Sequence, residues 1–448
     1  MRSYSYLSAQ ARTRNISLQS IVGGFIFLVY SGALLLSGQA WANDVAADDQ
    51  VWTLPGLIEE LKAHNLQLQQ ARLAYQAAQW QVPLANTLPS PQIGLLEQAN
   101  TGGPFNFNAD SGFYAYPTFT QPFLWPGKLR LAGEIAKAQA EVVGRQYDSL
   151  LVQLVSQLKL SFYQLSATHN QLRFMDEDLH RLEQIKEVSR LGYENNATAY
   201  VDYLNAQVSA SSLENDRFRL DKQIQQQVEQ INNLLGRASQ SPLKIKDADS
   251  NPQLPATSLD KLIERAQKNN PVVSGGEFQV LAAEKSVQLA EKSFWPDFSF
   301  SVGAYTDPSL THAGSTRMFS IGLNINLPTW GFRKEKAGLG QARALLDEAH
   351  ASQAFNLNQI DLSVANAYHS LETALRQLKF TRERLLPQAQ LAYRLALTSY
   401  SSNGGTGFPD LLTAQSSLRD TELSQIQAEN NAVQAYVSLT SSIGSDPD

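Results

Sequence analysis

The sequence contains no cysteine, three methionines and six histidines among its 448 residues. Without cysteine the chain forms no disulfide, no thiolate metal site and no lipid anchor on a cysteine. The histidines are scattered rather than clustered and do not predict a metal centre. The motifs G-x-S-x-G, G-x-x-x-x-G-K and H-E-x-x-H are also absent. We therefore predict that the protein is not an enzyme and needs no cofactor and no metal.

Long hydrophobic runs are lacking beyond residue 42. A window of about 18 apolar residues does not occur there, which excludes a bundle of membrane-spanning helices. A β-barrel stays open as an interpretation, because its alternating strands leave a weak hydropathy signal. Basic charge is also scarce: beyond residue 42 there are 33 Lys and Arg against 42 Asp and Glu, a net charge of −9. This balance predicts no binding to nucleic acid, which depends on clustered Lys and Arg.

The first 42 residues have the order of a secretory signal peptide. Three arginines and no acidic residue precede an apolar stretch at 21–36, and Ala40-Trp41-Ala42 follows it. A basic region, an apolar region and an A-x-A site in this order predict cleavage after Ala42. The apolar stretch is short for a membrane span, which needs roughly 20 residues. Export with cleavage is therefore favoured over a retained anchor.

The rest of the chain contains an internal repeat with an offset of 205 residues. The positions that match at this offset are Leu57 and Leu262, Asn65 and Asn270, Pro91 and Pro296, Trp125 and Trp330, and Tyr163 and Tyr368. The offset grows to 208 where Asp202 matches Asp410, and the matches stay in order. Chance similarity between Ala- and Gln-rich helices would not keep such a register, so we infer a duplication. The predicted division is a signal peptide (1–42), a first repeat (43–236), a linker (237–256) and a second repeat (257–448).

Each copy predicts the same order of elements. A first helix, at 55–85 or 259–293, precedes two strands joined by a Gly-rich polar loop. The predicted strands are 93–96, 113–123, 298–304 and 319–327. In the second copy apolar and polar residues alternate along both strands, which is the period of two of a strand with one apolar face.

The next element of each copy is a very long helix. Proline does not occur from 131 to 192 or from 334 to 385. Apolar residues follow both segments at alternating steps of three and four, and in the second copy we extend this stripe through Leu385, Ala392 and Leu395. Such a seam predicts helices packed side by side, and about 60 residues reach about 90 Å. A shorter helix then returns at 200–235 and at 408–443.

The strands of one chain are too few to close a barrel. Unpaired strand edges are not tolerated in lipid, so other subunits must complete the barrel. Two chains would supply about eight strands, which their side chains roughly fill, and three would supply about twelve, which leave room for a pore. The residues by themselves leave both numbers open.

Two kinds of segment carry a family resemblance. The strand-to-helix junctions are Gln121-Pro122-Phe123-Leu124-Trp125-Pro126-Gly127-Lys128 and Leu327-Pro328, which leads through Trp330 and Gly331 into Arg333-Lys334. The predicted helical tips contain Asp202-Tyr203-Leu204-Asn205-Ala206-Gln207 and Asp410-Leu411-Leu412-Thr413-Ala414-Gln415. In order and spacing, these segments resemble the TolC-type outer-membrane efflux proteins (outer-membrane factors) over essentially the whole mature chain. The Trp-Pro-Gly-Lys junction resembles members associated with heavy-metal cation efflux.

The resemblance implies a mainly α-helical fold with a transmembrane β-barrel portion. It implies a homotrimer with a twelve-stranded barrel among the lipids of the outer membrane of a Gram-negative bacterium, and an α-helical tunnel in the periplasm. The linker would lie in an equatorial belt around the tunnel. The chain would be a passive exit duct that works with two partners. These are an inner-membrane pump, for which the RND type is the first expectation, and a periplasmic membrane-fusion adaptor.

The cargo is left open by the sequence. The junction favours heavy-metal cations, and drugs or a polypeptide secreted by a type I system are the alternatives. A third class, a non-channel periplasmic protein built on a long coiled coil, would explain the helices but not the paired strands.

Asp202 and Asp410 are the candidate aperture residues, because they begin the returning helices at the predicted tips. A threefold ring of carboxylates would favour cations at a narrow point. Alternatively, each Asp caps or favours a helix N-terminus, where negative charge is stabilising. The two roles are compatible.

Other residues of the tips and junctions have two interpretations each. Gly192, Asn403, Gly404 and Gly405 are candidates for contact with the adaptor, or they serve turns that need permissive backbone angles. At the junctions, Trp125, Trp295 and Trp330 either anchor the barrel at the lipid interface or pack in the strand–helix joint. Pro126, Gly127, Pro328 and Gly331 would redirect the chain from strand to helix, because Pro restricts and Gly widens the choice of backbone angles.

Overall fold

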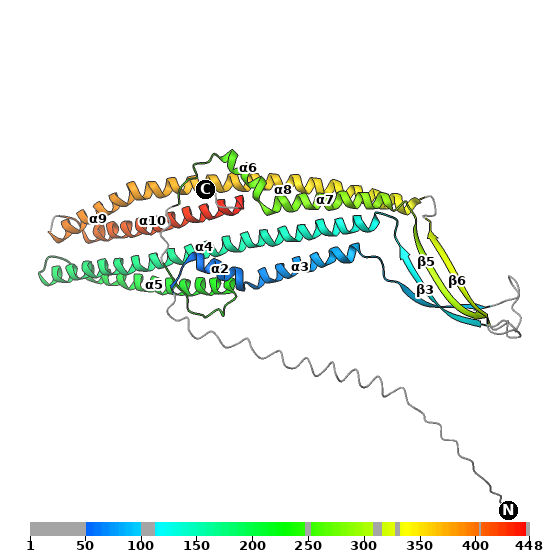
Figure 1. Ribbon diagram of the computed structural model, residues 1–448. Helices are drawn as coiled ribbons and strands as arrows, with labels where there is room; N and C mark the ends of the chain where they lie inside the picture. The colour runs from blue at the N-terminus through cyan, green and yellow to red at the C-terminus, as the bar shows by residue number, and fades with distance from the viewer. Residues whose placement is uncertain are drawn as a thin grey trace, which may run out of the picture. The chain divides into compact units, whose positions relative to one another are not determined.

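The computed structural model describes residues 51–99, 113–246, 252–307, 316–327, 332–402 and 405–444 (Figure 1). The predicted signal peptide and its cleavage site lie outside these residues. The first copy comprises β1 (Val51–Trp52), α2 (Leu54–His64), α3 (Leu66–Asn86), β2 (Gln92–Ala99), β3 (Phe113–Phe123), α4 (Lys128–Glu194), α5 (Tyr200–Leu235) and β4 (Lys244–Ile245). The second comprises α6 (Leu259–Asn269), α7 (Pro271–Lys292), β5 (Asp297–Asp307), β6 (Thr316–Asn326), α8 (Arg333–Phe380), the π-helical turn η3 (Thr381–Leu385), α9 (Leu386–Ser401) and α10 (Phe408–Ile443).

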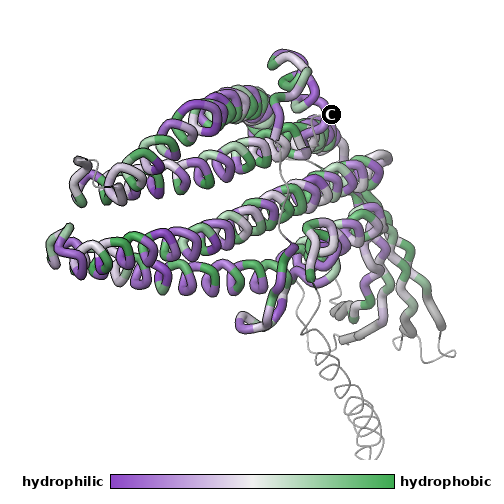
Figure 2. The backbone as a smooth tube through the Cα atoms, turned by 90° about the vertical axis from the view of Figure 1, so that its left-hand side faces the viewer, coloured by the Kyte–Doolittle hydropathy of each residue, from purple (hydrophilic) through white to green (hydrophobic). Residues whose placement is uncertain are grey.

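The order of elements confirms the predicted duplication. The strand β3 and the returning helices α5 and α10 have the bounds that the sequence predicts. Hydrophilic and hydrophobic residues are interspersed along the long helices (Figure 2). Within the described part of the chain, no helix is both long and apolar enough to cross a membrane.

The prediction of one continuous first helix in each copy is wrong. The helix breaks at Asn65 in the first copy and at Asn270 in the second, and both residues have extended backbone angles. The Asn65 side chain accepts a hydrogen bond from the Leu68 amide (2.8 Å) and donates one to the Leu234 carbonyl (2.7 Å). Asn270 likewise accepts from Val272 (2.9 Å) and donates to the Ser442 carbonyl (2.9 Å). Each Asn thus caps one helix and ties it to the end of a returning helix.

The four strands form one antiparallel sheet in the order β2-β3-β5-β6. The register places apolar residues on one face, in a row made of Ile93, Phe119, Val302 and Ile321. The neighbouring row, Gly94, Thr118, Gly303 and Ser320, lies on the other face and carries small or polar side chains. The sheet therefore has the two unlike faces that the alternation predicts.

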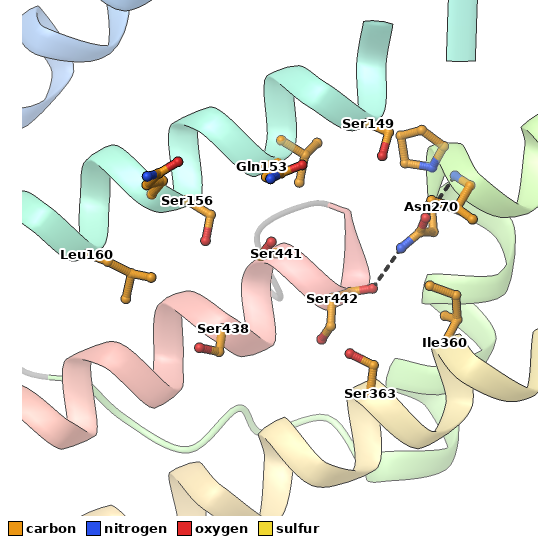
Figure 3. Close-up of a pocket in the computed structure, with 14 residues that line it drawn as sticks. Ser149, Gln153, Ser156, Leu160, Asn270, Ile360, Ser363, Ser438, Ser441 and Ser442 are labelled. Carbon is orange, nitrogen blue, oxygen red and sulfur yellow. Dashed lines mark hydrogen bonds between the residues drawn. The ribbon is translucent and has the colours of Figure 1, made fainter. Parts of the chain in front are cut away.

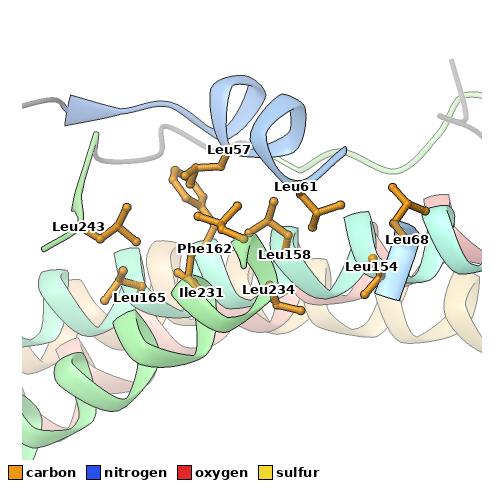
Figure 4. Close-up of a cluster of buried hydrophobic side chains, with 11 residues drawn as sticks. Leu57, Leu61, Leu68, Leu154, Leu158, Phe162, Leu165, Ile231, Leu234 and Leu243 are labelled. Carbon is orange, nitrogen blue, oxygen red and sulfur yellow. The ribbon is translucent and has the colours of Figure 1, made fainter. Parts of the chain in front are cut away.

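The long helix α4 lies between the two copies. It packs against α3 and α5 of its own copy and against α7 and α10 of the other (Figure 1). Leu154, Leu158 and Leu165 of α4 are buried with Leu57 and Leu61 of α2 (Figure 4). In the second copy, α6 is buried in the same way against α8 and α10.

The apolar stripe that we extended through Leu385, Ala392 and Leu395 is wrong beyond residue 380. Those side chains are exposed, and the buried ones are Tyr393 and Tyr400. The π-helical turn η3 inserts one extra residue, marked by the Leu386 amide bonding to the Thr381 carbonyl, and shifts the stripe by one position. Pro387, which has no N–H to donate, follows directly.

We predict that Asn65→Ala destabilises the protein by about 1–3 kcal/mol, because it leaves the buried Leu234 carbonyl and the Leu68 amide without partners. Thermal unfolding of detergent-solubilised protein, followed by circular dichroism, measures the effect. The control is Asn205→Ala on the exposed side of α5, which should leave the unfolding temperature unchanged. Equal unfolding temperatures for both variants would contradict a structural role for Asn65.

Candidate functional site

The first helical tip joins α4 to α5 through a short turn. Its left-handed residue is Asn196, with φ of 56°, whereas Gly192 lies inside α4. A Cβ on Gly192 would stand 2.6 Å from the Thr198 hydroxyl oxygen. The permissive backbone angle predicted for Gly192 is therefore not its role. Gly192 instead leaves room for Thr198, which donates a hydrogen bond to the Ser189 carbonyl (3.2 Å).

The second tip joins α9 to α10. Its predicted residues Asn403 and Gly404 lie outside the described residues. Gly405 has φ of 88° and open space where a Cβ would stand, so it has the left-handed backbone that the sequence predicts. Contact of either tip with an adaptor stays a prediction.

The two tips pack on one another within one chain. Tyr400 and Phe408 of the second tip are buried, with ring centroids 5.8 Å apart. They share a hydrophobic cluster with Leu182 and Ile185 of α4 and Ala206 of α5. This contact between the two repeat copies places Tyr400 of the second tip next to Asp202 of the first.

The candidate aperture residues occupy different environments. Asp202 is half-buried in the first turn of α5, and its carboxylate accepts a hydrogen bond from the Tyr400 hydroxyl. Burial raises the pKa of the Asp202 carboxyl, and the bond from Tyr400 acts in the opposite direction. Asp410 is exposed in the first turn of α10. Neither Asp is the N-cap, a position held by Ala199 and Gly407; their charge near the helix N-terminus is still favourable.

A buried ionic cluster, which the sequence did not predict, joins the copies above the tips. The Asp178 side chain of α4 is 1% exposed, and both of its oxygens accept from the Gln415 amide of α10 (3.0 and 2.8 Å). Arg181 lies 3.2 Å from Asp178 and pairs with Glu422 of α10 at 2.8 Å. The Tyr393 hydroxyl is buried, has no hydrogen-bond partner within the described part of the chain, and faces the same charges.

The cluster shifts the ionisation of its carboxyls. Burial raises the pKa of Asp178 and of Glu422 above their ordinary values, against the lowering effects of Gln415 and Arg181. Burial alone would lower the pKa of the Arg181 guanidinium, but the hydrogen bond to Glu422 and the charges of Glu422 and Asp178 together outweigh it and raise that pKa. Arg181 therefore stays charged between two carboxyls that bind protons more readily than usual.

The junction between sheet and helices is held by a second ion pair. The Asp297 carboxylate accepts from the Trp125 backbone amide (2.7 Å) and from Lys128 (2.8 Å). Lys128 also donates to the Trp295 carbonyl (3.0 Å). The Trp125 and Trp295 rings stack with centroids 5.0 Å apart. Trp125 and Trp295 thus contact one another in the strand–helix joint, although Trp295 is 53% exposed. Anchoring of these tryptophans at the lipid interface stays a prediction.

The helices α4 and α8 both start from a left-handed residue. Gly127 precedes α4 with φ of 91°, and Phe332 precedes α8 with φ of 57°. Gly127 thus redirects the chain as predicted. In the second copy Pro328, Trp330 and Gly331 lie outside the described residues.

The sequence model of a family described as "Outer membrane efflux protein" matches residues 57–237 and 262–445, most of each copy. The chain belongs to the outer membrane efflux protein family. This confirms the predicted TolC-type membership and, because the family is one of channels, the prediction that the chain is not an enzyme.

Curated relatives are distant. Nodulation protein T of Rhizobium leguminosarum bv. trifolii is 23% identical over 414 residues, which cover 88% of this chain and 85% of that protein. Outer membrane efflux protein BepC of Brucella suis is 23% identical over 205 residues, 45% of this chain and 44% of BepC. The match to BepC thus spans under half of the length of either protein.

Solved structures of the same fold cover more of the chain. The outer-membrane channel OprN has a TM-score of 0.75 at 20% identity, covering 87% of this chain and 89% of OprN. VceC of Vibrio cholerae has a TM-score of 0.73 at 20% identity, covering 88% and 97%. CusC also has a TM-score of 0.73 at 20% identity, covering 88% and 92%. At these identities the likeness establishes the fold, which is mainly helical with a tandem repeat and a small β portion.

We predict that Arg181→Ala destabilises the protein by about 3 kcal/mol, because it leaves Asp178 and Glu422 buried without a cation. The matched control is Arg219→Ala, which removes an exposed pair with Asp216 and should cost less than about 1 kcal/mol. Thermal unfolding of the two variants decides. Similar losses in both would contradict the buried cluster.

We predict the opposite sign for Asp178→Asn. Because the folded-state pKa of Asp178 is raised, its ionised form costs stability at neutral pH, and this cost is removed as the pH falls through the raised pKa. The neutral amide should therefore leave the unfolding temperature at neutral pH unchanged or higher and flatten its dependence on acid pH. An unfolding temperature that drops as far as in Arg181→Ala would refute this assignment.

Proposed function

We propose that the chain is the exit duct of a tripartite efflux system, in which three protomers form one channel across the outer membrane. The observation that supports the proposal is a single sheet with two open edges that is joined to very long helices, one in each copy of the repeat. With 67 residues, α4 reaches about 100 Å at 1.5 Å per residue. Such helices suit the wall of a tunnel rather than the core of a globule.

The sheet supports assembly into a closed barrel. The strands β2 and β6 are its edges, and their outer backbone groups need partners in lipid. Ile93 is 83% exposed and Ile321 is 74% exposed, and both lie on the apolar face. Pairing the β6 edge of one protomer with the β2 edge of the next protomer satisfies the backbone groups of both edges and presents the apolar face to lipid. Three copies would then supply twelve strands.

The lateral helices support the same closure. Exposed apolar side chains follow α3 at Leu66, Leu73, Trp80 and Leu84. Others lie on α8 at Leu345, Phe355 and Leu362. Helix α3 is at one side of the helical layer and α8 is at the other. The two apolar surfaces would therefore meet between neighbouring protomers and be buried there.

The partners are an inner-membrane pump, of RND type in the first instance, and a periplasmic adaptor that engages the helical tips. Gly192, Asn403, Gly404 and Gly405 are the tip residues proposed for that contact. The predicted signal peptide, cleaved after Ala42, would export the chain to the periplasm.

Heavy-metal cations are the cargo that we propose first, on the form of the Trp125–Lys128 junction. CusC, whose crystal structures are described in terms of folding and transmembrane channel formation, shares the fold. Drugs or a secreted polypeptide are the second candidate. A relative 22% identical over 318 residues is named Toxin and drug export protein A, from Aggregatibacter actinomycetemcomitans.

A deletion strain tests the cargo. We expect it to become sensitive to heavy-metal salts and to recover when the intact gene is restored. Sensitivity to dyes alone would refute the metal proposal and favour drug efflux. Heat-modifiable migration of a trimer in the outer-membrane fraction separates any channel from a periplasmic coiled-coil protein.

We predict that the double variant Asp202→Ala, Asp410→Ala raises single-channel conductance or lowers cation preference in planar bilayers. Removal of a carboxylate ring widens the aperture and removes its attraction for cations. Glu214→Ala, at an exposed carboxylate further along α5, is the control and should change neither. No change in the double variant would remove both residues from the aperture.

A further inference from the structure

A cavity of about 650 Å³ opens between the two copies near the Asn270 break (Figure 3). Helix α4 lines one side of it, and α7, α8 and α10 line the other. None of the 14 lining residues carries a charged side chain. We call this cavity the serine groove, after the serines that line it on α4, α8 and α10.

The serine groove offers unused hydrogen-bonding groups. Figure 3 shows Ser156 of α4 and Ser441 of α10 directed into the space between these helices. The Ser438 and Ser442 hydroxyls donate to carbonyls of their own helix, at 2.8 and 2.9 Å. The hydroxyls of Ser149, Ser156, Ser363 and Ser441 have no hydrogen-bond partner within the described residues.

The position of α2 and α6 shows which face of the helical layer carries the groove. Leu154 of α4 is buried in one cluster with α2, and Leu439 of α10 in another with α6. Ser156 and Ser441 each follow these leucines by two residues, which is about 200° around a helix of 3.6 residues per turn. Ser156 and Ser441 of the serine groove therefore point away from α2 and α6.

Neutral amides join α4 and α10 beyond the groove. The Gln164 side chain of α4 accepts hydrogen bonds from Asn430 (2.7 Å) and Gln434 (2.9 Å) of α10. Gln434 is seven residues, about two turns, before Ser441 and so lies on the same side of α10. The amides thus continue the neutral surface from the groove toward the tips.

We propose that the serine groove lines the conduit and binds neutral, hydrogen-bonding groups, such as hydroxyl, ether or amide groups, of polar solutes that pass through it. The inference rests on the proposed duct: in a closed tube the extra helices α2 and α6 stand outside, because inside they would obstruct passage. The opposite face then borders the lumen.

The chemistry of the lining decides the class of ligand. Hydroxyls and amides both donate and accept hydrogen bonds, which matches polyol-like or amide-like groups. An ion that sheds its water there would find no opposite charge in the lining, and that loss of hydration is costly. Ions therefore pass this level with their water, while neutral polar solutes exchange water for serine and glutamine.

The absence of cysteine makes the face of the wall directly testable. In planar bilayers, single variants Ser441→Cys and Ser156→Cys would be treated with cationic and anionic methanethiosulfonates. We expect a loss of conductance with both reagents and shifts of reversal potential of opposite sign. Ser258→Cys, exposed at the start of α6, is the matched control and should respond to neither.

The outcomes separate the two proposals. If mass spectrometry confirms that Ser441→Cys is completely modified and the conductance of the channel does not change, the serine groove is not a lumen surface. The proposed duct would be unaffected by that result. A response at Ser258→Cys alone would place the lumen on the other face and overturn the groove. A trimer that forms no conducting channel in any variant, the wild type included, would instead overturn the proposed duct.

The class of ligand is tested with maltotriose as the neutral probe and trilysine as the cationic probe. We expect maltotriose to block wild-type current and the block to weaken several-fold in the double variant Ser156→Ala, Ser441→Ala. Block by trilysine should be unchanged in that variant. Equal maltotriose block in both proteins, or weaker trilysine block in the variant, would refute a neutral site.

Discussion

The packing of α4 against the second copy is the contact on which the arrangement depends. A duplicated chain is free to fold as two separate units, each with its own core. Here α4 of the first copy contacts α7 and α10 of the second, while β3 pairs with β5 at one end. The sheet and the helical layer are therefore continuous across the duplication. This continuity leaves the sheet of one protomer with two open edges. Pairing with the sheets of further protomers would bury these edges.

A buried ionic cluster interrupts the apolar packing between α4 of the first copy and α10 of the second. Asp178, Arg181 and Glu422 replace part of the apolar seam with a buried cation between two carboxyls. Such a group adds little net stability but is costly to leave half-formed. It therefore favours one alignment of α4 with α10 over alignments shifted along the helices. The candidate aperture residue Asp202 and the neighbouring Tyr400 lie on the tip side of this cluster, so their contact depends on that alignment.

The serine groove and the two candidate aperture carboxylates lie at different levels of the helices. The face opposite to α2 and α6 carries serines and amides around the cavity, whereas Asp202 and Asp410 are found at the tips. In the proposed duct, any preference for ions would be set at the tips. The wall above would interact with neutral polar groups. A duct of this kind leaves the choice of cargo to the pump that feeds it.

The sequence by itself determined the duplication, because matching residues recur at an offset of 205 residues. It also determined the strands and the returning helices, because these depend on a local period of two or of three to four residues. Family membership followed from the order of the junction and tip segments. The breaks at Asn65 and Asn270 were missed, although both residues had been matched across the repeat. Their partners Leu234 and Ser442 lie 169 and 172 residues away, and no local pattern contains such a bond.

Tertiary structure alone decided the phase of the stripe after Phe380, the partners of Asp178 and the face on which the serine groove lies. The stripe failed at Leu385 because one extra residue in a π-helical turn rotates everything that follows. Arg181 reads as a surface cation until Glu422, 241 residues later, is placed beside it. The serines read as unremarkable helix surface until α2 and α6 cover the opposite face. In each case the physical reason is the same: burial and pairing are set by chain segments that are distant in sequence.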